Sequence, residues 1–158
     1  MIRKKILLIG DFNVGKTSLI RRYVDNTFDD KYLTTIGVKI SKKLVEIKED
    51  ACELLIWDVE GATAVKKIPI AYMKGASGAI FVGDVTRKET IESIENHIDI
   101  FLNINPDAHY VKAYNKIDAL NASQKEELTL DEKSFFSSAK DDLNVAQLFE
   151  YLTKEMLG

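Results

Sequence analysis

The chain has 158 residues and a mass of 17.9 kDa, which suits one domain with a full hydrophobic core. Apolar residues make up 46% and charged residues 30%, with only 8 glycines and 2 prolines, so collagen-like, disordered and low-complexity chains are excluded. A formal net charge of −3 gives no electrostatic reason to expect nucleic acid as a partner. The single cysteine, Cys52, excludes an internal disulfide framework and a cysteine-based zinc finger, and His97 and His109 are predicted to be ordinary surface or core residues.

The sequence carries no signal for membrane insertion or lipid attachment. No apolar run reaches the roughly 18 residues that a membrane span needs, and the run at 6–9 is too short for a signal peptide. Ile2 does not fit the N-myristoylation pattern, and the last four residues contain no cysteine to prenylate. We therefore expect a cytoplasmic protein without an intrinsic membrane anchor, provided that no further tail follows residue 158.

The N-terminal half begins with an apolar run of strand length at 6–9. A turn-rich segment follows, and apolar residues at helical spacing then predict a helix over 16–25. The polar segment 26–35 has no periodicity and is expected to be a loop. Alternating apolar residues predict a strand at 38–47, with a second strand at 52–57 as its hairpin partner.

The C-terminal half continues this alternation of strands and helices. The predicted elements, in chain order, are an aperiodic segment at 59–67, a helix from Pro69 to about Lys74, a strand at 79–82, a helix at 88–104, strands at 110–114 and 134–136, and a helix at 142–157. Strands that alternate with helices favour a doubly wound α/β sheet. With no repeat, linker or domain boundary, residues 1–158 are expected to form one domain.

The turn-rich segment 10–17, Gly-Asp-Phe-Asn-Val-Gly-Lys-Thr, fits the pattern G-x-x-x-x-G-K-[ST] at a strand-to-helix junction. In such a loop, successive backbone N–H groups converge on phosphate oxygens at the positive end of the following helix. Lys16 would reach the β- and γ-phosphates, and the Thr17 hydroxyl would bind Mg²⁺. The residues predicted to hold the nucleotide here are Asn13, Val14, Gly15, Lys16, Thr17 and Ser18.

A second polar motif, Asn115-Lys116-Ile117-Asp118, follows the predicted strand at 110–114. In a doubly wound sheet this places it at the carboxyl edge, where ligands bind. A carboxylate at Asp118 accepts hydrogen bonds from guanine N1–H and the 2-amino group together, whereas adenine offers neither donor. Asp118 is therefore predicted to select guanine, which opposes an ATP-using phosphoryl transferase.

These motifs resemble those of the small GTPases of the Ras superfamily, most closely its Rab-like branch, over nearly the whole chain. The resemblance implies a P-loop G domain, a six-stranded, mostly parallel sheet flanked by about five helices, which binds GTP or GDP with Mg²⁺. It implies roles for three further segments: Thr34–Val38 is similar to the effector loop, Trp57–Gly61 to the Asp-x-x-Gly motif, and Ser138-Ala139-Lys140 to the last guanine motif.

The same resemblance assigns individual roles. Thr35 would bind Mg²⁺ and the γ-phosphate, Asp58 would hold Mg²⁺ through water, and the Gly61 N–H would sense the γ-phosphate. Lys16, Thr35 and Gly61 are thus the predicted catalytic residues. The remaining predicted contacts are to the base, from the Phe28 ring, the Lys116 stem, Asn115 and the Ala139 N–H.

The chain departs from the family around the γ-phosphate. Ala62 stands where active members carry a glutamine that orients the attacking water, Phe12 replaces a small residue, and Glu60 brings a carboxylate near a polyanion. These changes predict slow hydrolysis, although drift in a diverging homologue is an alternative. Asn13 resembles the asparagine with which potassium-activated GTPases bind K⁺, or it replaces a loop glycine.

Two function classes remain open. The first is a guanine-nucleotide switch that hydrolyses GTP slowly and signals to effectors, with an exchange factor and a GTPase-activating protein as possible regulators. The second is a non-cycling, nucleotide-bound scaffold. By resemblance, Ile40, Trp57 and Tyr72 match an effector-binding triad, and Lys39, Ser41, Lys42 and Lys43 form a predicted basic strip beside it.

Overall fold

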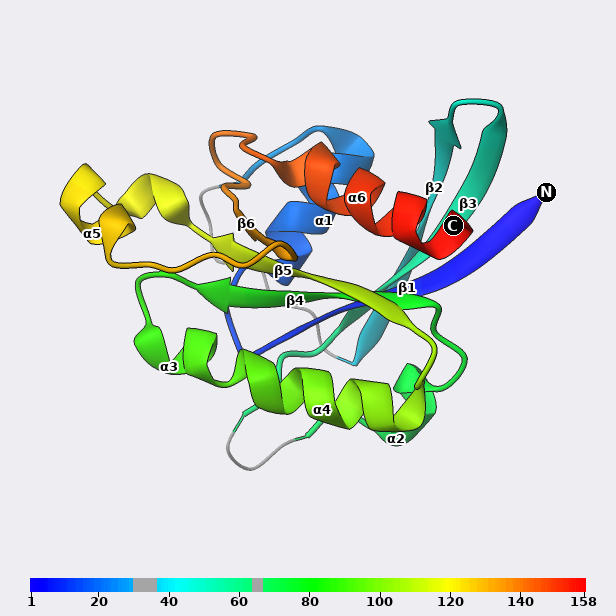
Figure 1. Ribbon diagram of the computed structural model, residues 1–158, viewed down its shortest axis with the longest axis horizontal. Helices are drawn as coiled ribbons and strands as arrows, with labels where there is room; N and C mark the ends of the chain where they lie inside the picture. The colour runs from blue at the N-terminus through cyan, green and yellow to red at the C-terminus, as the bar shows by residue number, and fades with distance from the viewer. Residues whose placement is uncertain (30–36, 64–66) are drawn as a thin grey trace.

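The structure is a computed structural model that describes residues 1–29, 37–63 and 67–158. Its six strands form one sheet in the order β2-β3-β1-β4-β5-β6 (Figure 1). β2 is antiparallel to β3, and all other neighbours are parallel, which confirms the predicted mostly parallel sheet. The strands are β1 (Ile2–Gly10), β2 (Val38–Ile47), β3 (Asp50–Val59), β4 (Gly78–Asp84), β5 (His109–Asn115) and β6 (Ser134–Phe136).

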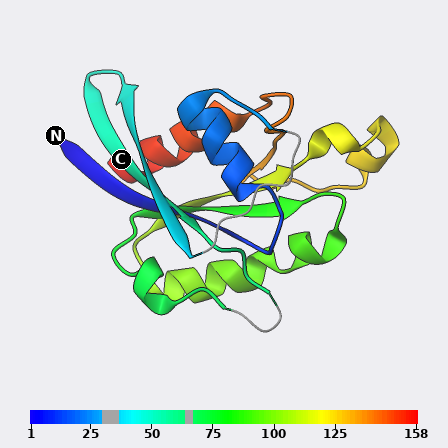
Figure 2. The same ribbon diagram turned by 180° about the vertical axis from the view of Figure 1, so that it is seen from behind.

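Helices cover both faces of the sheet. α1 (Lys16–Asp25) and α6 (Val145–Leu157) lie on one face, and α2 (Ile70–Met73), α3 (Lys88–Glu92) and α4 (Ile94–Ile104) lie on the other (Figures 1 and 2). β1 contributes to both cores because its side chains alternate: Ile6 and Leu8 pack with α1 and α6, and Leu7 and Ile9 pack with α2 and α4. All four are at most 1% exposed, as a central parallel strand requires.

The five parallel strands end at the same edge of the sheet, and the segments that follow them carry the motifs. β1 leads into the phosphate-loop motif, β3 into Glu60 and Gly61, β5 into the Asn-Lys-Ile-Asp motif and β6 into Ser138. The fold thereby brings residues from positions 10 to 138, up to 128 positions apart in the chain, to one edge of the sheet. This edge is where ligands bind in open α/β sheets.

The predicted helix at 88–104 is two helices, because it breaks at Ser93. The Ser93 hydroxyl lies 3.1 Å from the Thr90 carbonyl oxygen and 2.7 Å from the carboxylate of Asp11, outside the helix. Serine side chains that bond to the preceding turn bend helices. The break therefore follows from a contact between elements, which helical spacing does not report.

The final helix starts at Val145 rather than at 142. Asp142 and Asn144 have left-handed backbone angles (φ 54° and 57°), and the Asn144 side chain donates to the Phe136 carbonyl at 2.8 Å. Two short helices were not predicted: η1 (Ile117–Ala119) and α5 (Ala122–Glu126). A reciprocal capping box between Asn121 and Gln124 starts α5 and was its sequence signal. Across the described ranges, no helix has the length and apolar character of a membrane span.

Candidate functional site

The backbone of the phosphate-loop motif is shaped for an anion. Asn13 and Gly15 adopt left-handed angles (φ 64° and 104°), and α1 starts directly afterwards without a side-chain cap at its N-terminus. A Cβ atom on Gly15 would clash with Asn115 Nδ2, so only glycine fits here. The N-terminal N–H groups of α1 and the helix dipole together favour a bound phosphate at this end.

Lys16 lies inside the loop and is only 6% exposed. Its ammonium group has two long contacts, each 3.5 Å, to the carbonyl oxygens of Gly10 and Asp11. Burial lowers the pKa of Lys16 to about 8, although the negative charges of Asp58 and Asp11 oppose the shift. A desolvated cation with such weak partners favours a strong anion as its ligand.

Thr17 and Asp58 meet beside the loop. The Thr17 hydroxyl donates to Asp58 Oδ2 at 2.6 Å, and Asp58 is 3% exposed at the end of β3. A hydroxyl and a carboxylate are hard oxygen donors, and Mg²⁺ takes few protein ligands together with phosphate oxygens and water. The pair therefore fits a Mg²⁺ ion. Thr35, the third predicted ligand, lies outside the described residues.

Asn115 and Lys116 brace the loop from β5. Asn115 Nδ2 donates to the Val14 carbonyl at 3.0 Å, and its Oδ1 accepts from Ser137 Oγ at 3.0 Å. The Lys116 ammonium donates to the Asn13 carbonyl and pairs with Asp84 Oδ2, both at 3.0 Å. The structure thus places both residues against the phosphate loop, and Asp84 is an anchor whose role the sequence did not indicate.

The residues predicted to bind the base gather around the loop that follows β6. Asp118 is exposed, and its Oδ1 accepts a hydrogen bond from Ser138 Oγ at 2.6 Å. Ala139 is buried behind it. Arg22 of α1, which the sequence analysis missed, holds this loop by donating to the carbonyls of Ala139 and Lys140 at 2.8 and 2.9 Å. Lone polar residues on a helix give no sequence signal for such a contact.

Phe28 lies beside this group, with the Arg22 guanidinium 5.9 Å from its ring centroid. Its ring is partly buried against the core that α1 and α6 share. Phe28 and the loop that carries Ala139 thus share a contact with Arg22, and the packing of the ring on the base stays a prediction. Ser18, the last residue predicted in the phosphate loop, lies in the first turn of α1.

The segment after β3 docks on the phosphate loop through its backbone. The Ala62 N–H donates to the Gly10 carbonyl at 3.1 Å, and the Phe12 N–H donates to the Ala62 carbonyl at 3.0 Å. A Cβ on Gly61 would lie 2.6 Å from Phe12 Cα, so this approach requires glycine. The Ala62 side chain is a methyl group, and the Phe12 side chain stays 44% exposed.

The Glu60 carboxylate has a partner in the residue that precedes β2. Its Oε2 accepts from the Gly37 N–H at 3.2 Å, and the Glu60 N–H donates to the Gly37 carbonyl at 2.8 Å. The two contacts extend the pairing of β2 and β3 by one step. The Glu60 carboxylate thus contacts the residue before β2, and its closeness to the phosphates stays a prediction.

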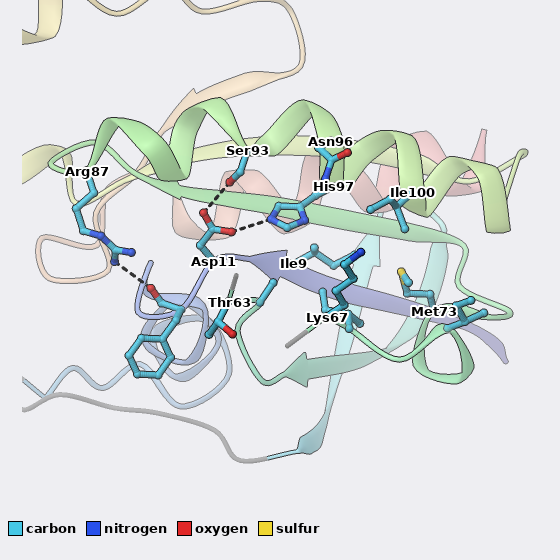
Figure 3. Close-up of a pocket in the computed structure, with 14 residues that line it drawn as sticks. Ile9, Asp11, Thr63, Lys67, Met73, Arg87, Ser93, Asn96, His97 and Ile100 are labelled. Atoms are coloured by element: carbon cyan, nitrogen blue, oxygen red, sulfur yellow. Dashed lines mark hydrogen bonds and ion pairs between the residues drawn. The ribbon is translucent and has the colours of Figure 1, made fainter. Parts of the chain in front are cut away.

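A cavity of about 820 Å³ lies between the phosphate loop and α4 (Figure 3). Asp11 forms its polar end: its carboxylate is 2.9 Å from His97 Nε2 and 2.7 Å from Ser93 Oγ. Ile9, Met73 and Ile100 are among its apolar walls. His97 was predicted to be an ordinary residue, and its contact with the loop was missed because it joins positions 86 residues apart.

The predicted effector residues form a continuous surface. Ile40 is paired with Trp57 across β2 and β3, and the Trp57 and Tyr72 ring centroids are 6.3 Å apart. Ile40 is 47% exposed, and the Lys5 ammonium lies 3.8 Å from the Trp57 ring centroid.

The predicted basic strip is divided by the pleat of β2. Lys42 shares the face of Ile40, whereas Lys39, Ser41 and Lys43 alternate to the other face, where Lys43 lies 5.3 Å from the Tyr23 ring centroid. The strip is thus not one surface, and the interpretation of these four residues as a single strip was wrong.

The doubly wound sheet, the glycine-bounded phosphate loop and the pair Thr17–Asp58 at its carboxyl edge define a P-loop nucleotide-binding protein. The sequence model of the Ras family matches residues 5–158. The chain is 35% identical to the Ras-related protein Rab-13 of Rattus norvegicus over 97% of its length and 79% of the relative's. It is also 34% identical to human Ras-related protein Rab-7b (98% and 82%) and 37% identical to Ras-related protein SEC4 of Saccharomyces cerevisiae (95% and 73%).

The chain therefore belongs to the Ras family, as a Rab-like small GTPase. Members of this family are GTP-binding switch proteins that hydrolyse GTP, and this activity is that of the chain.

Proposed function

We propose that residues 1–158 form one G domain that cycles between GTP and GDP with Mg²⁺, hydrolyses GTP slowly and signals to effectors. The observation that carries the slow step is the docking of Ala62 on the phosphate loop. This position offers a methyl group and no donor or acceptor, so nothing on it orients the attacking water.

Each motif takes a stated role in this proposal. The N–H groups of residues 13–18 and the Lys16 ammonium bind the phosphates, supported by the burial of Lys16 and the uncapped start of α1. Asp118 and the Ala139 N–H read guanine, supported by the Ser138 hydrogen bond that orients the carboxylate. Phe28, Asn115, Lys116, Ser138 and Lys140 complete the site around the base.

Mg²⁺ is held by Thr17 and Asp58 in this proposal, with Thr35 as a third ligand. When bound there, Mg²⁺ would neutralise charge on the phosphates. The 2.6 Å hydrogen bond from the Thr17 hydroxyl to the Asp58 carboxylate supports this assignment, because two oxygen ligands suited to Mg²⁺ lie side by side. Lys16 and the Gly61 N–H would then hold the γ-phosphate.

Effectors bind to the surface of Ile40, Trp57 and Tyr72 in this account. It is supported by the contiguity of the three side chains and by the exposure of Ile40. Because this surface adjoins the Glu60–Gly37 contact at the start of β2, a change at the γ-phosphate reaches it through one pair of strands. We propose an exchange factor and an activating protein as regulators, because the release of bound nucleotide and the slow hydrolysis of GTP would each need to be accelerated.

The alternative is a scaffold that holds one nucleotide and does not cycle. Chromatography of the nucleotide released from the purified protein separates the two functions. We expect GDP, or GDP with some GTP that is lost over hours. GTP that persists without loss would indicate a non-cycling module, and an empty site would contradict both functions.

Thr17→Asn tests the metal site, since asparagine cannot donate the same hydroxyl oxygen to Mg²⁺. Calorimetry should show a larger loss of affinity for GTP than for GDP, because GTP carries the larger phosphate charge for Mg²⁺ to neutralise. Ser41→Asn, on β2 away from the site, is the matched control. Equal losses for both nucleotides, or none, would remove Thr17 from the metal site.

A further inference from the structure

The phosphate loop of this protein contains a carboxylate, and the structure turns it away from the loop interior. Asp11 follows the last residue of β1, and both of its side-chain oxygens have partners on the α3–α4 segment. Ser93 Oγ donates to Oδ2 at 2.7 Å, and His97 Nε2 lies 2.9 Å from Oδ1 (Figure 3). An ionised carboxylate only accepts hydrogen bonds, so Nε2 carries a proton in this contact.

The same segment holds the next two residues of the loop. Arg87 Nη1 donates to the carbonyl oxygens of Phe12 and Asn13, at 2.9 and 3.3 Å. Ser93 is the residue at which the helix breaks, and its hydroxyl contacts Asp11 there. The segment 87–97 therefore contacts residues 11, 12 and 13 in succession.

Electrostatics explains why a carboxylate here needs partners. The Asp11 carbonyl lies 3.5 Å from the Lys16 ammonium, and the charge of Asp11 acts on Lys16, so Asp11 is close to the proposed phosphate position. A carboxylate that turned toward a polyphosphate would repel it and compete for Lys16. The side chains of His97 and Asp11 are only 12% and 23% exposed, so water screens the contact weakly.

We propose that Ser93 and His97 are positioning residues for nucleotide retention, which act by holding the Asp11 carboxylate away from the phosphates. The inference rests on the guanine-nucleotide binding that family membership establishes, and it adds residues that touch no nucleotide. It predicts that loss of either partner speeds nucleotide release, and that the effect requires the charge of Asp11.

The test measures release of a fluorescent GDP analogue into excess unlabelled GDP, with Mg²⁺ present. His97→Ala and Ser93→Ala should each release the analogue about tenfold faster, as expected for the loss of one hydrogen bond to a charged group. Asn96→Ala is the matched control, because Asn96 is next to His97 on the same wall of the cavity. It should change the rate less than twofold.

A double-mutant cycle separates positioning from a general loss of packing. In an Asp11→Ala background, His97→Ala should change the release rate less than twofold, since no carboxylate remains to be held. An equal acceleration in both backgrounds would overturn the proposal, and so would unchanged release of the His97→Ala protein. His97→Gln, whose amide N–H can replace Nε2, should restore most of the slow release. If neither His97→Gln nor the Asp11→Ala background suppressed the fast release, the positioning role of His97 would be contradicted.

Discussion

Among single residues, Ser138 orients the Asp118 carboxylate through a hydrogen bond. This bond holds one Asp118 carboxylate oxygen 2.6 Å from the Ser138 hydroxyl oxygen, which restricts rotation of the carboxylate. The sequence motif therefore predicted the residue, and the structure adds the partner that orients it.

Asp118→Asn should abolish the preference for guanine. The amide presents a donor where guanine N1–H also donates, so GDP affinity should fall about a hundredfold or more. Competition binding of GDP against xanthosine and inosine diphosphates measures the change. Ser138→Ala, which removes only the orienting bond, should cost less. A variant with undiminished preference for GDP would contradict the role of Asp118.

Lys16 predicts a pH dependence of nucleotide binding. Its pKa in the nucleotide-free protein is about 8, and a bound phosphate raises it again because an opposite charge favours the ammonium form. Above pH 8, binding must therefore take up a proton, so GDP affinity should fall by up to about tenfold per pH unit. Below pH 8, Lys16 is charged in both states and contributes no slope.

Calorimetry in buffers of different ionisation enthalpy measures this proton uptake directly. We expect almost none at pH 7 from Lys16 and a clear uptake at pH 8.5. The sign for folding alone is the opposite one: the unfolded lysine holds its proton to higher pH, so this group makes the nucleotide-free protein more stable as pH rises from about 8 to 10.5. Release of protons on binding at pH 8.5 would contradict the placement of Lys16.

At the scale of elements, α1 is the link between the two ends of the site. Its first turn forms the phosphate side, and Arg22 in its last turn holds the carbonyls of Ala139 and Lys140. Arg22→Met should therefore loosen the base loop and speed GDP release about tenfold. The ratio of GDP to xanthosine diphosphate affinity should stay unchanged, because Asp118 remains in place.

The matched control for this change is Arg3→Met. Arg3 is an exposed arginine at the start of β1, whose Nε donates to Glu53 at 3.0 Å, far along the chain from the base loop. Its removal should leave GDP release unchanged. If the two variants released GDP at the same rate, the contact between α1 and the loop after β6 would have no role in retention.

The bounds of the helices and strands were predictable from the sequence only where local signals set them. α1, β2 and β6 begin and end at the predicted residues, because their apolar spacing and their turns are local signals. The break at Ser93 and the late start of α6 were missed, since each depends on a partner in another element, Asp11 for Ser93 and Phe136 for Asn144. Helix and strand propensities depend on neighbouring residues in the chain, so they do not predict such contacts.

At the scale of the whole molecule, the mostly parallel sheet and the family were predicted because the motifs are spaced along alternating strands and helices. In the candidate site, the motifs named residues such as Lys16 and Asp118, and their roles stay predictions. The sequence did not predict the residues that support the loops of the site, Arg22, Ser93 and His97. Single polar residues on amphipathic helices have the same pattern as solvent-exposed positions. The structure identified them by bringing the helices onto the loops.

We expect GTP hydrolysis to be slow because Ala62 cannot orient the attacking water, and single-turnover hydrolysis tests this expectation. In sodium buffer the rate should be about two to three decades below that of relatives with glutamine at this position, as expected for a few kcal/mol of lost orientation. Ala62→Gln alone should help little beside Phe12, and Ala62→Gln with Phe12→Gly should help more than the sum of the two.

The same assay in potassium buffer, with Asn13→Ala as control, decides between the slow switch and the cation mechanism. Asn13 has a left-handed backbone, and its carbonyl accepts from Lys116 and Arg87, as a substitute for a loop glycine would. We therefore expect equal rates in sodium and potassium. Hydrolysis in sodium as fast as in glutamine-bearing relatives, or a large potassium stimulation that Asn13→Ala removes, would contradict the account.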